Sequence, residues 1–252
     1  MEEANRQQVS APGCSAEERT RIWGDVLAQA ITGEIIGALN YETLAELYDQ
    51  PAEKSEALEH AASERAHAAR FRAAGRDLLG LDIAANLDAP YWKRIRSAVV
   101  SRALLNDLFG CILVQELMLE SFAVASYQVV AGAAPGKLGS TFAAIAREEA
   151  EHVAHAIEML QVERARDPRD FDTKLLGVHE EVMATLAEMV AREDPAGHCG
   201  LCKESCVKPS LPHVGFSASE LRGASLRRYL QTLDEIGVPG ESTLAWVARL
   251  PV

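Results

Sequence analysis

Hydrophobic residues recur along the chain every three to four positions, which is the period of an amphipathic helix. No stretch shows the alternation that a strand requires, and prolines at wide intervals separate the periodic segments. The first four segments, joined by short connections, predict an all-α four-helix bundle. The predicted helical runs extend from about Ala16 to Tyr48, from about Ala52 to Leu79, from Pro90 to Val130, from Ser140 to about Arg166, and from Pro168 to before Pro195.

The chain after the fifth run has a different composition. It is rich in Gly, Pro, Cys and Lys and predicts a loop or a small knot, after which Ser217 and Glu220 have the spacing of a capping box that opens a helix. We therefore expect a disordered N-terminus over residues 1–15, a helix bundle over 16–194, a Cys-rich loop or knot over 195–216, and C-terminal helices packed on the bundle over 217–252.

Composition and charge exclude some functions. The chain has 252 residues, of which 48% are hydrophobic, and a formal net charge of -12. This acid excess argues against nucleic-acid binding, which depends on Lys and Arg to neutralise phosphates. The polar first 18 residues and the polar residues that interrupt the apolar stretch 108–130 predict no secretion signal and no transmembrane segment, so we expect a cytoplasmic protein.

Each of the first four runs carries a glutamate on its apolar face, where a charge is costly unless it is paired. Two runs carry a Glu-x-x-His pair, whose members project from the same face of a helix, and the chain has no other such pair. In the third run two glutamates four residues apart both lie on the apolar stripe, and periodicity does not choose between them. The candidates are Glu34, the pair Glu64 and His67, Glu116 or Glu120, and the pair Glu149 and His152.

This set of side chains predicts a site for two metal ions. One carboxylate from each of two helices and a Glu-x-x-His pair from each of two others is the pattern of ferritin-like di-iron and di-manganese proteins. Four carboxylates neutralise two divalent ions, so metal binding offsets the cost of burying them. His60 and His155 also lie near the stripe, where polar or supporting neighbours of the site are a better interpretation than ligands.

The same segments resemble a known family, the cyanobacterial aldehyde-deformylating oxygenases, which are ferritin-like di-iron enzymes. The resemblance covers about residues 23–160 and loosely the last helix. It implies that Glu120, and not Glu116, is the ligand of the third helix. The matching stretches are Gly33-Glu34, Asn40 to Leu47, Glu64-Arg65-Ala66-His67, Phe71 to Arg76, Cys111 to Gln115, Leu119 to Ala123, Tyr127 and Glu149-Ala150-Glu151-His152.

The resemblance implies a set of site residues. The implied iron ligands are Glu34, Glu64, His67, Glu120, Glu149 and His152. Tyr41, Gln115, Phe71 and Tyr127 match positions near the metal or the substrate channel, although a core aromatic residue with its hydroxyl satisfied is an equally good interpretation of each tyrosine.

The resemblance also implies an activity. The family uses O2 and external electrons, usually from a ferredoxin or a reductase, to cleave a long-chain aldehyde into an alkane one carbon shorter and formate. Glu116 departs from the family, which has a small apolar residue there, and it would place a carboxylate near the apolar channel. This departure and the Cys-rich segment described next, which also has no counterpart in the family, leave open an N-oxygenase acting on an amine, hydroxylamine or hydrazine. A third hypothesis is iron storage or peroxide scavenging. Storage would require a large cage of subunits, whereas an oxygenase is expected to be a monomer or homodimer.

The Cys-rich segment has no counterpart in the family. Three cysteines lie within eight residues, with one histidine before them and another after them. They predict a structural zinc site, a dithiol that passes electrons to the irons, or a flexible loop with free thiols, and no residue decides between these. The residues concerned are His198, Cys199, Cys202, Cys206 and His213.

Overall fold

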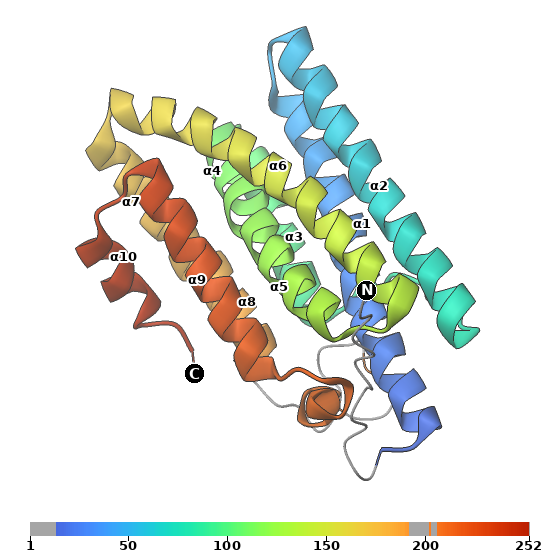
Figure 1. Cartoon of the computed structure of the whole chain (residues 1–252). Helices are drawn as coiled ribbons and strands as arrows, with labels where there is room; N and C mark the ends of the chain where they lie inside the picture. The colour runs from blue at the N-terminus through green and yellow to red at the C-terminus, as the bar shows by residue number, and fades with distance from the viewer. Residues whose placement is uncertain (1–13, 192–201, 203–205, 252) are drawn as a thin grey trace, which may run out of the picture.

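A computed structural model of the chain describes residues 14–191, 202 and 206–251. All regular elements in these ranges are helices, which confirms the all-α prediction. Figure 1 shows α1 beside α2 and α5 beside α6, with α3 behind them. The bundle consists of α1 (Ala16–Leu47), α2 (Pro51–Leu79), the segment from α4 to α5, and α6 (Gly136–Arg166).

Local sequence signals set the ends of these helices. The Ser15 side chain accepts a hydrogen bond of 3.0 Å from the backbone N–H of Glu18 and so caps α1. Pro51 begins α2, and Gly80 ends it with a φ of 64°, a left-handed conformation that glycine adopts without strain. The predicted capping box of Ser217 and Glu220 is present at the start of α9.

The prediction of one continuous helix from Pro90 to Val130 is wrong. Helix α3 (Pro90–Ala103) ends in a turn in which Asn106 has a φ of 56°. The Asp107 side chain then accepts a hydrogen bond of 2.9 Å from the backbone N–H of Gly110 and opens α4 (Leu108–Ile112). An Asn in the left-handed region followed by an Asp cap stops one helix and starts another, and the hydrophobic spacing does not reveal this change.

A π-helix interrupts the segment that follows. Helix η1 (Leu113–Leu119) separates α4 from α5 (Glu120–Ala133), and the backbone N–H of Glu120 donates to the carbonyl of Gln115, five residues earlier. A π turn places residues five apart on nearly the same face, whereas an α-helix does so for residues three or four apart. The inward face of this helix is therefore shifted relative to the 3.6-residue period.

Further helices cover one side of the bundle. Figure 1 shows α9 and α10 as an outer layer, with α9 running beside α8, and α9 packs on both α5 and α6. The elements of this layer are α7 (Pro168–Val178), the π turn η2 (His179–Met183), α8 (Ala184–Ala191), the 3-10 turn η3 (Lys208–Val214), α9 (Ala218–Ile236) and α10 (Gly240–Val247).

The apolar core consists of two clusters. One contains Tyr41 and Leu117, and the other contains Phe71, Tyr127 and Phe142. The hydroxyl of Tyr41 and that of Tyr127 each bond to a buried glutamate, so a layer of carboxylates lies between the clusters.

Two helical stretches of the described chain are long and apolar enough to cross a membrane. They are residues 16–47 and 108–133, and 67% and 78% of their most apolar windows are buried within the protein. Both are core helices of the bundle.

Candidate metal centre

The six side chains predicted as metal ligands converge at the middle of the bundle. Their oxygen and nitrogen atoms form two overlapping groups, in each of which the potential ligand atoms lie within 4.8 Å of one another. The two glutamates of the Glu-x-x-His pairs belong to both groups. The first group is Glu34, Glu64, His67 and Glu149, and the second is Glu64, Glu120, Glu149 and His152.

The buried carboxylates of the cluster lack hydrogen-bond partners at several atoms. Glu64 and Glu149 are 3% and 0% exposed, yet Glu64 Oε1, both carboxylate oxygens of Glu149, and His152 Nδ1 form no well-aligned hydrogen bond and meet only one another and His67 Nδ1, at 2.8 to 3.7 Å. Orphaned buried polar atoms are rare because each costs the free energy of its lost hydration. Cations bound between the two groups would satisfy these atoms, so the residues fit a pair of metal ions.

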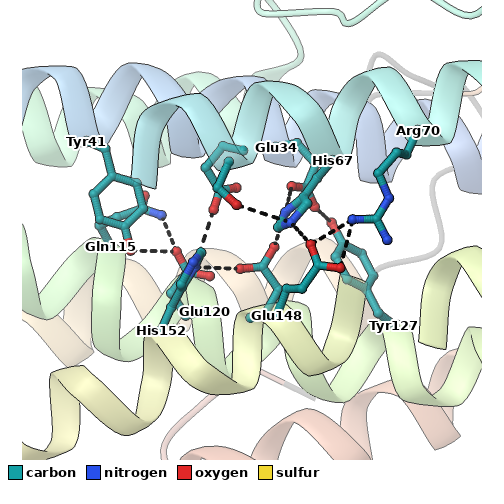
Figure 2. Close-up of polar contacts among 12 residues, drawn as sticks. Glu34, Tyr41, His67, Arg70, Gln115, Glu120, Tyr127, Glu148 and His152 are labelled. Atoms are coloured by element: carbon teal, nitrogen blue, oxygen red, sulfur yellow. Dashed lines mark hydrogen bonds and ion pairs between the residues drawn. The ribbon is translucent and has the colours of Figure 1, made fainter. Parts of the chain in front are cut away.

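The ring of His67 is held from both sides. Its Nδ1 lies 3.1 Å from Glu34 Oε2 and 2.8 Å from Glu149 Oε1. Its Nε2 lies 2.9 Å from Glu148 Oε2, and Arg70 Nη1 donates to both oxygens of Glu148 at 2.7 and 2.8 Å. Figure 2 shows this arrangement, with Arg70 at the outer edge of the cluster. The outer carboxylate fixes the ring so that Nδ1 faces the cluster, as partners of metal-binding histidines do.

A chain of hydrogen bonds holds the opposite end of the cluster. The Tyr41 hydroxyl and the Gln115 amide donate to Glu120 Oε1 at 3.0 and 2.8 Å. Asn40 in turn donates to Gln115 Oε1 at 2.7 Å, and Arg96 donates to Asn40 Oδ1 at 3.0 Å. The contact between Gln115 and Glu120 joins residues five apart, which the π-helix η1 makes possible.

The predicted Tyr127 lies at the other end, where its hydroxyl donates to Glu34 Oε1. Figure 2 shows Tyr41 and Tyr127 at opposite ends of the cluster. Each tyrosine therefore bonds to the carboxylate of a different group, which fits a role at the site and equally fits a core aromatic residue with its hydroxyl satisfied.

Sequence reasoning missed several residues that support the cluster. Glu148 precedes the ligand candidate Glu149, and Arg70 follows His67 by one turn, so their positions beside the two Glu-x-x-His pairs were a usable signal. Asn40 and Arg96 gave no such signal, because they come from different helices and meet only in the fold.

Burial dominates the electrostatics of the cluster. It raises the pKa values of Glu64, Glu120 and Glu149, and repulsion between neighbouring carboxylates raises them further. Burial also lowers the pKa of His67, but hydrogen bonds and charges of Glu149 and Glu34 outweigh it and raise this pKa to about 11. Without metal the cluster therefore retains protons, which bound cations would displace.

A largely apolar cavity of about 160 Å³ reaches the cluster. Glu34, Glu64 and Glu120 form part of its wall at the inner end. The rest of the wall comes mainly from α1, α3, η1, α5, α6, α8, η3 and α9, and includes Val26, Trp92, Phe122, Phe142, Val190 and Leu221. The cavity can hold an apolar chain with one end at the carboxylates.

Of the residues predicted to lie near the metal or the substrate channel, Gln115 and Tyr127 are in the cavity wall, whereas Tyr41, Phe71, Glu116, His60 and His155 are not. Phe71 packs against Tyr127 and Phe142, with ring centroids 5.3 and 4.5 Å apart. Glu116 is 7% exposed, and burial, followed by the charges of Glu120 and Glu56, raises its pKa to about 8. Glu116 thus lies near the ligand candidate Glu120 but outside the cavity.

The two remaining histidines of that set lie at the Tyr41 end. His60 stacks on the Tyr41 ring at 5.0 Å and meets the ring of His152 edge-on at 4.3 Å. Burial, followed by the neighbouring His152 and His155, lowers the pKa of His60 to about 4. The Nε2 of His155 lies 3.4 Å from Glu56 Oε1.

The predicted cysteine site falls partly on residues that the structure does not describe. His198 and Cys199 lie outside the described residues, whereas Cys202 is half-buried and Cys206 is buried. His213 Nδ1 lies 3.5 Å from Glu18 Oε1, in a group with Cys14. Within residues 14–191, 202 and 206–251, no group of three potential ligands includes Cys202 or Cys206, so the described structure gives zinc binding no support there.

Comparison with known proteins identifies the family. Comparison with curated proteins gives no match. Among solved structures, the fold is similar to "Protein 19 with aldehyde deformylating oxidase activity" from Synechococcus, with a TM-score of 0.78 and 20% identity over 93% of this chain and 98% of that chain. This similarity confirms the predicted ferritin-like fold. Residues 19–166, more than half of the chain, match the family model described as long-chain fatty aldehyde decarbonylase, so the protein belongs to that family.

Proposed function

We propose that this protein is a nonheme di-iron enzyme that uses O2 and an external electron donor to cleave a long-chain aldehyde into an alkane and formate. The observation that carries the proposal is the pair of overlapping ligand groups at the inner end of an apolar cavity. Membership of the long-chain fatty aldehyde decarbonylase family supports the same substrate class.

The overlap suggests how the ligands are divided. These six side chains would hold the two irons: Glu34 and His67 belong to the first ligand group, Glu120 and His152 to the second, and Glu64 and Glu149 to both. Carboxylate and imidazole ligands suit iron or manganese, and the four carboxylates balance the charge of two divalent ions. When bound, the two irons would supply the binding and activation of O2 and the transfer of the donor's electrons.

The residues around the ligands would fix their positions. Tyr41 and Gln115 hold Glu120, and Tyr127 holds Glu34, each by a hydrogen bond to one carboxylate oxygen. A carboxylate that accepts such a bond has one oxygen fixed and presents the other at a defined angle. These bonds therefore organise both ends of the cluster for metal binding.

The cavity would orient the substrate. Its apolar walls favour an alkyl chain by about 0.8 kcal/mol for each buried methylene group, and its polar lining includes the carboxylates of the cluster alongside Gln29, Ser126 and Lys208. An aldehyde would therefore place its carbonyl group next to the carboxylates and its chain toward Val190 and Leu221. The walls would also keep water away from the reacting carbon.

The nitrogen-oxygenase alternative rested on two departures from the family, Glu116 and the Cys-rich segment. Since Glu116 does not line the cavity, its charge does not oppose an alkyl chain there. The family match also gives that alternative no support. We further expect a cytoplasmic monomer or homodimer with an external donor such as ferredoxin or a reductase. Size-exclusion chromatography would separate this expectation from an iron-storage cage.

The proposed activity can be tested directly. Iron-loaded protein, reduced and then mixed with O2 and a long-chain aldehyde, should release formate and an alkane. Glu64→Ala should abolish both products and lower the bound iron, and omission of O2 should abolish them without loss of iron. The proposal is wrong if iron-loaded, reduced protein yields no formate from aldehydes of several chain lengths.

A further inference from the structure

A column of potential ligands continues from the buried cluster toward solvent. On α2, Glu56 and His60 precede Glu64 at intervals of four residues. On α6, His155 follows His152 at an interval of three. Residues at these spacings lie on one face of a helix, and α2 packs against α6. The column therefore runs between the two helices that carry the Glu-x-x-His pairs.

The outer part of the column has the geometry of a metal site. The ligand atoms of Glu56, His60 and His155 lie within 4.8 Å of one another. The side chains of His155 and Glu56 are 48% and 50% exposed, and His60 is half-buried between them and the centre. Two imidazoles and one carboxylate suit a divalent first-row transition ion, and water can complete the coordination because the site is open.

This outer group contacts the buried centre directly. The ring of His60 meets that of the ligand candidate His152 at 4.3 Å and stacks on Tyr41, which bonds to Glu120. None of the outer residues lines the cavity. An ion bound outside is therefore one helical turn from the inner ligands and does not have to pass through the apolar cavity.

We propose that Glu56, His60 and His155 form a third, exchangeable site for a divalent transition-metal ion, through which ions enter the buried pair. The outer site is exposed to water, so its binding of the ion is reversible. The inner carboxylates are stabilised more by a bound ion, because they are buried. The inference rests on the metal pair of the proposed function but not on the aldehyde substrate.

The test compares the rate at which Co²⁺ alone loads the metal-free, full-length protein, followed by the absorbance of bound cobalt. The double variant Glu56→Gln, His155→Gln removes two of the three outer ligands. The matched control is Glu59→Gln, Glu151→Gln, which changes two exposed residues on the same helices. The melting temperature of each metal-free variant should equal that of the wild type, because all four positions are exposed.

The double variant should load about tenfold more slowly, a change on the order of the affinity losses that removal of groups around a metal causes. It should reach the same final occupancy of the buried pair and lack a weaker third ion, whereas the control should behave as the wild type. Equal loading rates of double variant and control would overturn this inference alone. A wild type that takes up no ions at the buried pair would overturn the proposed function and this inference together.

Discussion

The space at Gly37 offers a sharp test of the metal centre. Gly37 lies on α1, three residues after Glu34, and a Cβ atom added there would lie 2.9 Å from Glu64 Oε2 and 3.3 Å from Gln115 Nε2. Since real Cβ atoms essentially never show contacts under 3.0 Å, the Glu64 carboxylate, the far end of a flexible side chain, would have to move by a few tenths of an ångström. We therefore expect Gly37→Ala to displace the carboxylate that the two ligand groups share.

The expected effects on folding and on metal binding have opposite signs. Ala in place of Gly within a helix favours folding by about 1 kcal/mol. Metal–ligand distances, however, tolerate only about 0.2 Å, and a misplaced supporting group typically weakens metal binding by about 10- to 100-fold. Gly37→Ala should therefore fold but bind iron about 10- to 100-fold more weakly than the wild type.

The assay is iron bound per chain in competition with a chelator, together with the free energy of unfolding of the metal-free protein. Gly177→Ala is the matched control, because it also lies in a helix and a Cβ there meets nothing within 4 Å. The control should gain stability and keep its iron affinity. Wild-type iron affinity in Gly37→Ala would refute the assignment of Glu64 as a ligand at its observed position.

Three further changes test the cavity, the support of His67 and the buried Glu116. Val26→Trp narrows the cavity eight residues before Glu34 and should raise KM for long aldehydes with iron content unchanged. Glu148→Ala removes the carboxylate 2.9 Å from His67 Nε2 and should weaken iron binding by about 10- to 100-fold in chelator competition. Burial raises the pKa of Glu116 from 4.5 to about 8, so the metal-free folded state binds this proton more tightly and its stability falls as pH rises between those values. Glu116→Gln should remove this loss, gaining about 3 kcal/mol over wild type between pH 5 and pH 8 in denaturant unfolding.

Each of these expectations has a contrary result. An unchanged KM in Val26→Trp would place the aldehyde outside the cavity. An iron affinity of Glu148→Ala equal to that of Glu151→Ala, an exposed position on the same helix, would show that Glu148 does not support the centre. A stability difference between Glu116→Gln and wild type that does not change with pH would show that Glu116 ionises normally.

The sequence was sufficient to predict most of the helices and to name the ligand candidates. Burying a glutamate such as Glu34 or Glu149 on an apolar stripe costs free energy unless a partner compensates its charge. Two Glu-x-x-His pairs limit what that partner can be. Helical periodicity can be recognised within each segment by itself, so the helices can be predicted without knowing how the segments pack.

Other features depend on the fold and could not be predicted this way. The π-helix η1 shifts the register of its face, so periodicity alone could not choose between Glu116 and Glu120. The turn at Asn106 broke a segment whose hydrophobic pattern continues on both sides. The cavity wall and the bond from Asn40 to Gln115 join helices far apart in the sequence, and such contacts leave no local pattern.

Anomalous X-ray diffraction from crystals of the iron-loaded protein tests the central claim most directly. The account predicts two iron peaks per chain, one near Glu34 and His67 and one near Glu120 and His152, with Glu64 and Glu149 contacting both. A single peak, or iron bound elsewhere while these carboxylates remain without metal, would contradict it.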